Sequence, residues 1–425
     1  MFRTAHLGAL ALALAVLAGC VSPPPIQAPP RAAAEVPAVE PKQPSALELK
    51  LPPQSAPGAV AGAYDGLAAW KSAQLAPGRE ALGRSCNALG NRPAAEPLSD
   101  NAPWAGRVGD WRALCASLEA FDGGNESTRR AFESLTVPVE ITDTWGASRL
   151  TGYFEPMIEA RRSPEPGFTA PVPGLPPDLV QTGSGPMKRG PGGRLSAYPP
   201  RAEIEPDLAL ALGYAHPADV FFLQIQGSGR LRFPDGATVR ASYAAHNGHP
   251  FKSTANWLIE RGKIQRGEAS MQGIRAWMDR VSAAEAREAM EANPRYVFFR
   301  VRPEGDASLG PVGAANIPLT ALGSMAVDPA FHPLGVPYLV ETNAPGLGGE
   351  WRGILVSQDT GGAIQGPVRG DIYFGSGNQA GDRAGTMNAP GRFWALLPRA
   401  AAKRLYRAAA EGASAPGHVQ LAQLP

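Results

Sequence analysis

Two aspartates near the C-terminus are the residues with the clearest potential for chemistry. Asp359 follows the apolar run 354–357, and Asp371 precedes the run 372–374, with a glycine-rich turn between them. Both runs are typical of short strands, and strand pairing would bring the two carboxyls together at the rim of a sheet. A carboxylate pair placed there can perform general acid and base catalysis. The alternative is that both aspartates cap a glycine-rich loop.

Other motifs give weaker support for other kinds of chemistry. His246 and His249 lie close together, but the chain has only six histidines, and no cysteine or carboxylate is spaced to complete a tetrahedral metal set. The turn 227–229 lacks the lysine and helix start of a phosphate-binding loop. The Asp-Thr-Gly triplet 359–361 matches an aspartic protease motif, yet the required second copy is absent. The sequence predicts neither a metal nor another cofactor.

The composition is that of a near-neutral, turn-rich protein. The 425 residues carry a formal net charge of +2 and include 49 glycines and 44 prolines. A charge this small gives no reason to expect nucleic-acid binding. The glycine and proline content favours turn-rich β structure with irregular linkers.

The N-terminus has the features of an export signal. The apolar run 7–18 is too short for a comfortable transmembrane span and ends in Leu-Ala-Gly-Cys. This ending resembles a bacterial lipobox, so residues 1–20 are predicted to be a lipoprotein signal peptide with Cys20 as the lipidated residue. An ordinary secretory signal is the alternative. Val21 favours outer-membrane sorting, and we expect a lipid anchor at the periplasmic face of the outer membrane.

The next segment and the two remaining cysteines fit an exported protein. Residues 21–57 are rich in proline and alanine and lack an apolar period, which predicts a disordered tether. An oxidising compartment permits a disulfide between Cys86 and Cys115. Two buried free thiols are the alternative, and the sequence leaves the choice open.

The run 220–233 supplies candidate ligand-binding residues. It is predicted to form a strand, a Gly-Ser-Gly turn and a second strand. Gln224 and Gln226 would then share one face of the strand, with Ser228 and Arg230 close behind. Amides and an arginine suit a hydroxyl-rich ligand, whereas the alternative is a polar face exposed to solvent.

Several sequence blocks, taken together and in order, carry more information than any single motif. They are Thr-Gly-Tyr-Phe-Glu-Pro at 151–156, Arg-Ala-Glu-Ile at 201–204, and the blocks 223–229, 247–253, 293–299 and 359–366 with 371–373. These blocks resemble the membrane-bound lytic murein transglycosylase A family, and the resemblance runs from about residue 58 to 398. The loop at 367–370 departs from the family pattern.

The resemblance implies a fold that is mainly β. A double-psi β-barrel domain is expected from residues 58–156 and 303–398, with a second β-rich domain, 157–302, inserted into it. A few helices are expected in the N-terminal part and at the C-terminus, where residues 399–425 form a helix and a tail. The glycan would lie in the groove between the two domains.

The resemblance also implies an activity and a monomeric enzyme that acts on peptidoglycan glycan strands. It would cleave the β-1,4 bond between N-acetylmuramic acid and N-acetylglucosamine without water, leaving a 1,6-anhydromuramoyl end. Asp371 would act first as acid and then as base, with a raised pKa. Asp359 would supply a negative charge or hold the loop, and Asp382 is a third, more structural candidate. The expected groove contacts are Tyr153, Gln224, Gln226, Ser228, Arg230 and Tyr373.

Two rival functions remain at this stage. One is a glycan-binding module without catalysis, since expansin-like barrels bind glycans on a related scaffold. The other is an inverting hydrolase in which Asp371 is the acid and Asp359 places a water as base. Room for a water between the two carboxyls would favour the hydrolase.

Overall fold

The computed structural model describes residues 47–52, 63–120, 124–143, 148–303, 305–412 and 418–420. All of them belong to one compact unit. The predicted signal peptide, Cys20 and most of the predicted tether lie outside these ranges. Within the ranges, no helix has the length and apolar character needed to span a membrane.

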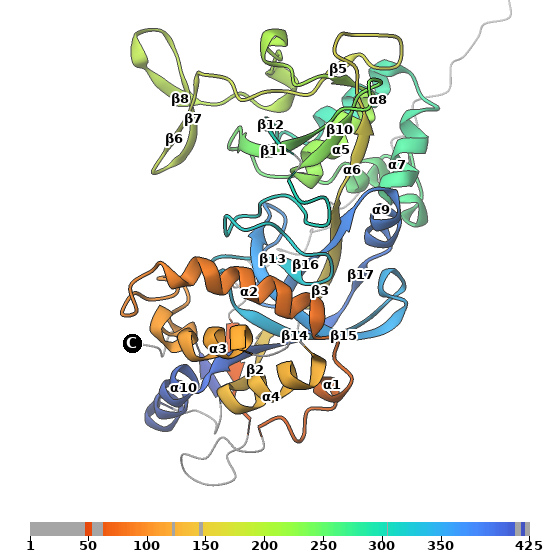
Figure 1. Ribbon diagram of the computed structural model, residues 1–425. Helices are drawn as coiled ribbons and strands as arrows, with labels where there is room; N and C mark the ends of the chain where they lie inside the picture. The colour runs from red at the N-terminus through yellow and green to blue at the C-terminus, as the bar shows by residue number, and fades with distance from the viewer. Residues whose placement is uncertain are drawn as a thin grey trace, which may run out of the picture. The chain divides into compact units, whose positions relative to one another are not determined.

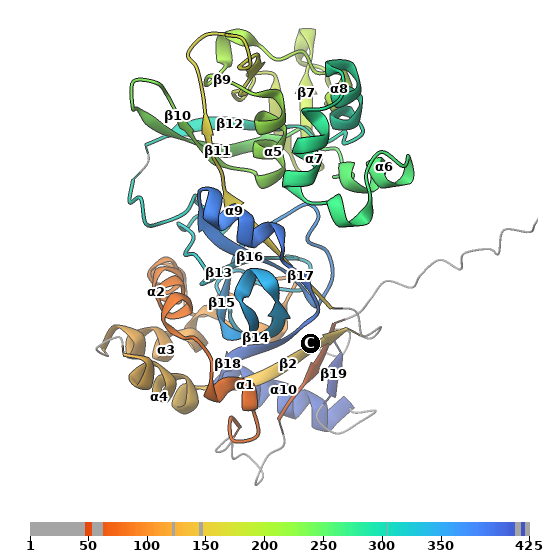
Figure 2. The same ribbon diagram turned by 90° about the vertical axis from the view of Figure 1, so that its right-hand side faces the viewer.

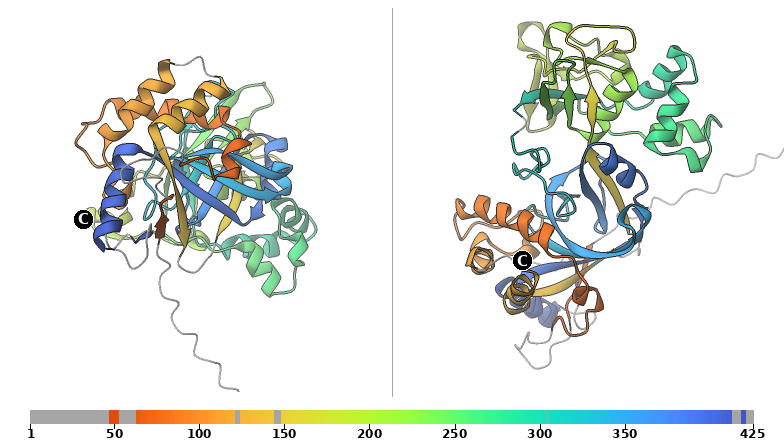
Figure 3. Two further views of the ribbon diagram at one scale, coloured as in Figure 1. Left: turned by 90° about the horizontal axis from the view of Figure 1, so that it is seen from below. Right: turned by 45° about the vertical axis from the view of Figure 1, so that its right-hand side comes forward.

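A mixed ten-stranded sheet is the largest element of the structure (Figure 1). Its strand order is β17-β3-β16-β13-β15-β14-β18-β2-β1-β19. The sheet is strongly curved (Figure 3). Neighbouring strands are antiparallel except for the parallel pairs β13·β15 and β16·β3. The bounds are β1 Leu47–Lys50, β2 Thr136–Asp143, β3 Arg149–Glu155, β13 Ser324–Val327, β14 Pro337–Ala344, β15 Gly349–Thr360, β16 Arg369–Ser376, β17 Asn388–Ala389, β18 Gly391–Pro398 and β19 His418–Gln420.

Strand β1 corrects the predicted extent of the tether. Leu47 and Leu49 are fully buried, and the strand pairs antiparallel with β2. The prediction ran the tether to residue 57, because prolines and alanines surround this short alternating segment. Two leucines at a spacing of two are enough to bury one face of a short strand.

Helices α2 and α3 pack on one side of the ten-stranded sheet (Figure 2). Gly78 of α2 lies against Ile354 of β15, and a Cβ at residue 78 would come within 2.4 Å of the Ile354 carbonyl oxygen. Cys86 and Cys115 form a disulfide between α2 and α3, with Cα atoms 5.4 Å apart, so the bridge is confirmed over free thiols. The bounds are α1 Ala68–Lys71, α2 Ala76–Gly90, α3 Val108–Ala120, α4 Asn125–Leu135, α9 Asn378–Gly385 and α10 Arg399–Gly412.

A four-stranded sheet of order β12-β11-β10-β4 is built from the middle of the chain. Its strands are β4 Met157–Glu159, β10 Gly229–Arg232, β11 Thr238–His246 and β12 Val297–Arg302. Two small sheets accompany it, formed by β5 Ala170–Pro171 with β9 Tyr214–Ala215, and by β6 Leu179–Thr182, β7 Gly185–Arg189 and β8 Leu195–Ala197.

Helices also pack in this middle part of the chain, in addition to those expected in the N-terminal part and at the C-terminus. The apolar faces of α5 and α7 share one hydrophobic cluster that includes Phe221, Ile274 and Trp277. The protein is thus mainly β with helices at several places. The bounds are α5 Pro217–Gln226, α6 Thr254–Glu260, α7 Met271–Met278 and α8 Ala283–Glu291.

The predicted strand at 220–226 is wrong, because this segment forms helix α5. Pro217 occupies the first turn, the His216 side chain accepts a hydrogen bond from the Ala218 N–H, and Gly227 ends the helix in the left-handed conformation. A buried apolar run fits a strand and a helix equally well by periodicity alone. Only the helix start and stop residues distinguish the two.

A buried carboxylate ties the two large sheets together where β3 leads into β4. Glu155 is fully buried and accepts hydrogen bonds from the Nε atoms of Arg230 at 2.8 Å and Arg240 at 2.6 Å. Ser376 of β16 donates to the same carboxylate at 2.6 Å. Removing one partner from such a cluster leaves an uncompensated buried charge, which is costly.

Candidate active site

Asp359 and Asp371 lie on strands that flank a third strand. The prediction that their two runs pair directly is wrong, because β13 lies between β15 and β16. Ala326 of β13 is the register partner of both aspartates, one on each side. Directly opposed residues share a face of a sheet, so both carboxyls project from the same face. Two strand spacings separate their backbones by roughly 10 Å.

A β-bulge sets the direction of Asp359. Met325 pairs with Ser357 and Ala326 with Asp359, so Gln358 is an extra residue on β15. The buried Gln358 amide donates to the Ala81 carbonyl at 2.7 Å and to Ser85 Oγ at 2.8 Å, both on α2. Bulges of this kind re-aim side chains next to active sites. In a regular ladder, position 359 would move to the opposite face.

The Asp371 carboxyl is held by a relay of two side chains. Thr151, its register partner on β3, donates from Oγ1 to Asp371 Oδ1 at 2.6 Å. Arg369 in turn donates from Nη2 to Thr151 Oγ1 at 2.8 Å. Burial raises the pKa of the Asp371 carboxyl above its ordinary value, while Arg369 and the Thr151 hydrogen bond lower it in part. The second carboxyl oxygen is left to carry a proton.

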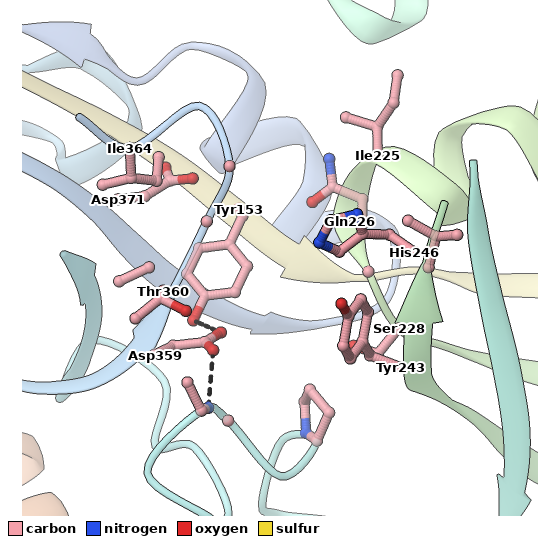
Figure 4. A pocket seen from close by; sticks show the side chains of 18 of the residues that line it. Tyr153, Ile225, Gln226, Ser228, Tyr243, His246, Asp359, Thr360, Ile364 and Asp371 are labelled. Carbon is pink, nitrogen blue, oxygen red and sulfur yellow. Dashed lines mark hydrogen bonds between the residues drawn. The ribbon is translucent and has the colours of Figure 1, made fainter. Parts of the chain in front are cut away.

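Asp359 is held more completely than Asp371. Its Oδ1 accepts a hydrogen bond from the Ala314 N–H at 2.9 Å, and its Oδ2 accepts one from the Tyr153 hydroxyl at 2.8 Å (Figure 4). Burial raises the pKa of Asp359, and the negative charge of Asp371 contributes further in the same direction. For Asp371 the dominant cause of the raised pKa is burial, not the charge of Asp359. Asp359 therefore acts mainly as an anchor for the loop at Ala314.

A cavity of about 560 Å³ contains both carboxyls. Figure 4 shows Tyr153 and Asp359 on one side, with Gln226, Tyr243 and His246 on the other. The ten-stranded sheet contributes Gly152, Tyr153, Ala326, Asp359, Arg369 and Asp371 to the lining, and the middle part of the chain contributes Gln224, Gln226, Ser228, Ser242, Tyr243 and His246. The cavity size and its mixture of amides, hydroxyls and an aromatic ring suit a polar ligand such as a sugar.

The predicted groove contacts divide into two groups. Tyr153, Gln224, Gln226 and Ser228 line the cavity. Arg230 does not, because its guanidinium is committed to Glu155. The other exceptions are also explained by their contacts: Tyr373 is buried and its hydroxyl hydrogen-bonds Ser376, while Asp382 is exposed on α9 and accepts a hydrogen bond from Gln272.

A half-buried arginine, Arg201, supports the far side of the cavity from outside its lining. The Arg201 guanidinium donates to the carbonyls of Asn293 at 3.0 Å and Arg295 at 2.6 Å, and to Gln224 Oε1. The Gln224 amide also donates to the Val297 carbonyl at 2.9 Å. Burial lowers the pKa of Arg201 to about 10. Because this value is still well above 7, the guanidinium stays charged at neutral pH. The two predicted amides therefore differ: Gln224 is mainly structural, whereas Gln226 is partly exposed.

The loop between the two aspartates is fixed, although its sequence departs from the family pattern. His332 is buried, and its Nε2 lies 2.7 Å from the Pro367 carbonyl oxygen. Asp328 accepts a hydrogen bond from the Gly366 N–H at 2.8 Å. Burial lowers the pKa of His332 to about 4, so the ring is neutral at pH 7. Asp371 consequently enters β16 as its third residue.

The sequence reasoning missed several residues of the site. Thr151, which contacts Asp371, could have been found, because it stands two residues before Tyr153 and so shares its face of β3. Three arginines also line the cavity, Arg295, Arg300 and Arg302. Nothing in the sequence pattern indicated this, because they stand out only as basic residues near a strand end. Among the described residues, no group of three histidine, cysteine or acidic side chains is arranged to bind a metal.

Comparison with known proteins points to one family. A family model described as the MltA specific insert domain matches residues 149–300, and one described as the 3D domain matches residues 323–397. The protein named membrane-bound lytic murein transglycosylase A from Escherichia coli strain K12 is 37% identical over 286 residues, which are 64% of this chain and 72% of that protein. The Vibrio cholerae protein of the same name is 35% identical over 285 residues, again 64% of this chain and 72% of the relative.

Solved structures agree with the sequence comparison. The crystal structure of a membrane-bound lytic murein transglycosylase from Agrobacterium tumefaciens superposes with a TM-score of 0.70 at 30% identity, covering 80% of this chain and 98% of the other. The Escherichia coli MltA structure with bound chitohexaose gives a TM-score of 0.57 at 28% identity, covering 75% and 90%. The present chain belongs to the membrane-bound lytic murein transglycosylase A family.

Proposed function

We propose that this protein cleaves the β-1,4 bond between N-acetylmuramic acid and N-acetylglucosamine in peptidoglycan and leaves a 1,6-anhydromuramoyl end. Its family membership supports a lytic transglycosylase that acts on peptidoglycan. The observation that carries the chemical step is Asp371: a half-buried carboxyl with a raised pKa that lines the cavity and is oriented by Thr151.

In the proposed reaction one carboxyl acts twice. Protonated Asp371 gives its proton to the glycosidic oxygen as the bond from that oxygen to C1 of the muramoyl residue breaks. The C6 hydroxyl of the same residue attacks C1, and its proton passes to the Asp371 carboxylate, which restores the enzyme. No water is consumed. A nucleophile within the substrate needs no second protein group to position it, because its effective concentration is already high.

The relay from Arg369 through Thr151 prepares Asp371 for both steps. The Thr151 hydroxyl accepts from Arg369 and donates to Asp371, so its hydrogen points at Oδ1. This arrangement favours placing the acidic proton on Oδ2. Arg369 stabilises the carboxylate that forms after the first proton transfer, while burial favours the protonated resting form. Burial and Arg369 therefore shift the pKa of Asp371 in opposite directions, and burial is the larger influence.

Asp359 argues against the hydrolytic rival. An inverting hydrolase needs a second carboxylate that is free to take a proton from water. Both Asp359 oxygens already accept hydrogen bonds, from the Ala314 N–H and the Tyr153 hydroxyl. Tyr153 remains protonated, since burial raises its pKa well above the ordinary value. A binding module without catalysis, in turn, has no use for a buried acid with a raised pKa.

We further propose the finer architecture and the address of the protein. The segments 58–156 and 303–398 would form a double-psi β-barrel domain, with 157–302 as an inserted domain and 399–425 as a C-terminal helix and tail. Cys20 would carry a lipid anchor at the periplasmic face of the outer membrane, and the enzyme would act as a monomer. The names of the relatives support membrane association.

The test is product analysis of purified murein digested by the protein. Muropeptides that are lighter by one water than lysozyme-type products, and resistant to borohydride, are expected. Reducible products would establish a hydrolase and return Asp359 to the role of base. Sedimentation with murein without any product would establish a binding module.

A further inference from the structure

The charges that line the cavity are unbalanced. Four arginines, Arg295, Arg300, Arg302 and Arg369, face two carboxyls, Asp359 and Asp371. Even with both carboxyls ionised, the four arginines outnumber them. Among the described residues, none of the four arginines forms an ion pair with a carboxylate. The cavity therefore presents a positive field to its ligand.

Two of these arginines have no hydrogen-bond acceptor within the described part of the protein. Arg300 is exposed and Arg302 is half-buried, and their spacing of two places them on the same face of β12. The arginines on the neighbouring strands contrast with them, because Arg230 and Arg240 are buried and bonded to Glu155. Of the other two cavity arginines, Arg369 is engaged by Thr151, and Arg295 reaches the His249 carbonyl at 3.3 Å.

Arg295 extends this cationic surface to the loop that follows Asp359. Its guanidinium lies against Gly362, where a Cβ would come within 3.1 Å of Arg295 Cζ. We call Arg295, Arg300 and Arg302 the arginine wall. A neutral sugar chain offers only hydroxyls and amides, which do not require unpaired guanidinium groups. A guanidinium matches a carboxylate with two parallel hydrogen bonds.

We propose that the arginine wall binds carboxylates of the peptide substituents on the muramoyl residues, so that the site prefers strands whose peptides carry free carboxylates to strands whose peptide carboxyls are blocked. The inference rests on the proposed function, because it takes the cavity as the place where murein glycan binds. The muramoyl residue at the scissile bond carries its peptide on the lactyl group, which places acidic groups beside the cleaved bond. Arg300 and Arg302 are the specificity-determining residues in this assignment.

The test measures binding separately from turnover. The full-length Asp371→Asn protein in detergent is titrated by calorimetry with murein tetrasaccharides that carry peptides, and with the same tetrasaccharides after their peptide carboxyls have been converted to amides. The ligand with free carboxylates is expected to bind about tenfold or more tightly, as one or two charge-assisted hydrogen bonds at a partly exposed site allow. Adding Arg300→Gln and Arg302→Gln is expected to bring the two dissociation constants to within about twofold and to weaken the salt dependence.

A matched substitution controls for nonspecific charge effects. Arg287 on α8 is exposed and does not line the cavity, so Arg287→Gln is expected to keep the tenfold preference. The single Arg300→Gln variant changes an exposed side chain and serves if the double variant does not fold. Equal weakening for both ligands would assign these arginines to the sugars and overturn the proposal, as would an unchanged preference. Because no turnover is involved, a wild-type protein that yields no anhydro product would refute the proposed activity alone.

Discussion

The two sides of the cavity satisfy their polar groups in opposite ways. On the carboxyl wall, formed by Thr151, Tyr153, Asp359, Arg369 and Asp371, every side chain has a partner within the protein. On the arginine wall, Arg300 and Arg302 have none among the described residues. The side chains of a preorganised wall do not have to rearrange during the reaction. The unpaired donors of the arginine wall, in contrast, remain free to form hydrogen bonds with a ligand. We therefore assign catalysis to the carboxyl wall and ligand recognition to the arginine wall of the same cavity.

Replacing the acid on the carboxyl wall should have the largest effect. Asp371→Asn removes the proton donor but keeps the oxygen that accepts from Thr151. We expect the rate of anhydromuropeptide formation to fall by at least about 10³-fold, since one group performs both general acid and general base catalysis. Turnover near the wild-type rate by the folded variant would remove Asp371 from this role.

The same variant should be more stable than the wild type at neutral pH. The pKa of folded Asp371 lies above its unfolded value, so its contribution to stability is complete below the unfolded pKa and is lost as the pH rises through the folded pKa. Asparagine carries no such charge. Thermal unfolding should give a higher Tm for Asp371→Asn at pH 7, with the difference shrinking as the pH falls. A lower Tm at pH 7 would show that burial of the charge is not the dominant influence.

Arg201 supports the backbone beside the arginine wall, and substituting it should remove that support. Arg201→Lys keeps a charge but cannot reach the carbonyls of Asn293 and Arg295 and the Gln224 amide together. We expect a loss of about 2–3 kcal/mol in the free energy of unfolding, measured by denaturant titration. Arg287→Lys, at an exposed position, is the matched control and should stay within about 0.5 kcal/mol of the wild type.

Interrupting the relay on the carboxyl wall should have a smaller effect with a characteristic pH signature. Thr151→Val removes the hydrogen bond that lowers the pKa of Asp371, so that pKa rises further. The maximal rate should fall about tenfold, the scale of one hydrogen bond to a charged group. The alkaline limb of the pH–rate profile should move to higher pH. Thr151→Ser should restore both; a rate loss without movement of the limb would indicate a purely structural role.

The contact between Arg295 and the loop that follows Asp359 gives the smallest predicted effect. Gly362→Ala places a Cβ about 3.1 Å from the Arg295 guanidinium, which must shift by a few tenths of an ångström. We expect a loss of about two- to fivefold in affinity for peptide-bearing fragments, under 1 kcal/mol, with kcat unchanged. Gly183→Ala has nothing within 4 Å of the new Cβ and is the control. An equal loss of affinity in both variants would show that Arg295 does not contribute to ligand binding by the arginine wall.

The carboxyl wall could largely be predicted from the sequence, because its residues follow strand periodicity. Asp359 and Asp371 stand out by their position beside apolar runs, and Tyr153 alternates with Thr151 on one strand. The insertion of β13 between their strands could not be predicted, since strand order depends on pairing between segments far apart in the chain. Yet both aspartates still reach one cavity, because both are register partners of Ala326.

The arginine wall escaped prediction for a different reason. Arg300 and Arg302 lie at the end of strand β12, and the direction of their side chains depends on the pairing of this strand with β11. The helix at 217–226 was mistaken for a strand, so Gln224 and Gln226 were placed on one face when only Gln226 is partly exposed. The disulfide could be anticipated as a possibility, and only the approach of α2 to α3 decided it.

The extra residue in β15 links the direction of Asp359 to helix α2. Gln358 has no register partner on β13, and its amide is held by Ala81 and Ser85 of α2 instead. If Gln358 were released and paired with Ala326, Asp359 would move opposite Val327 and turn to the other face of the sheet. Helix α2 contributes no residue to the cavity lining, so a substitution there could disable the site while every lining residue stayed the same.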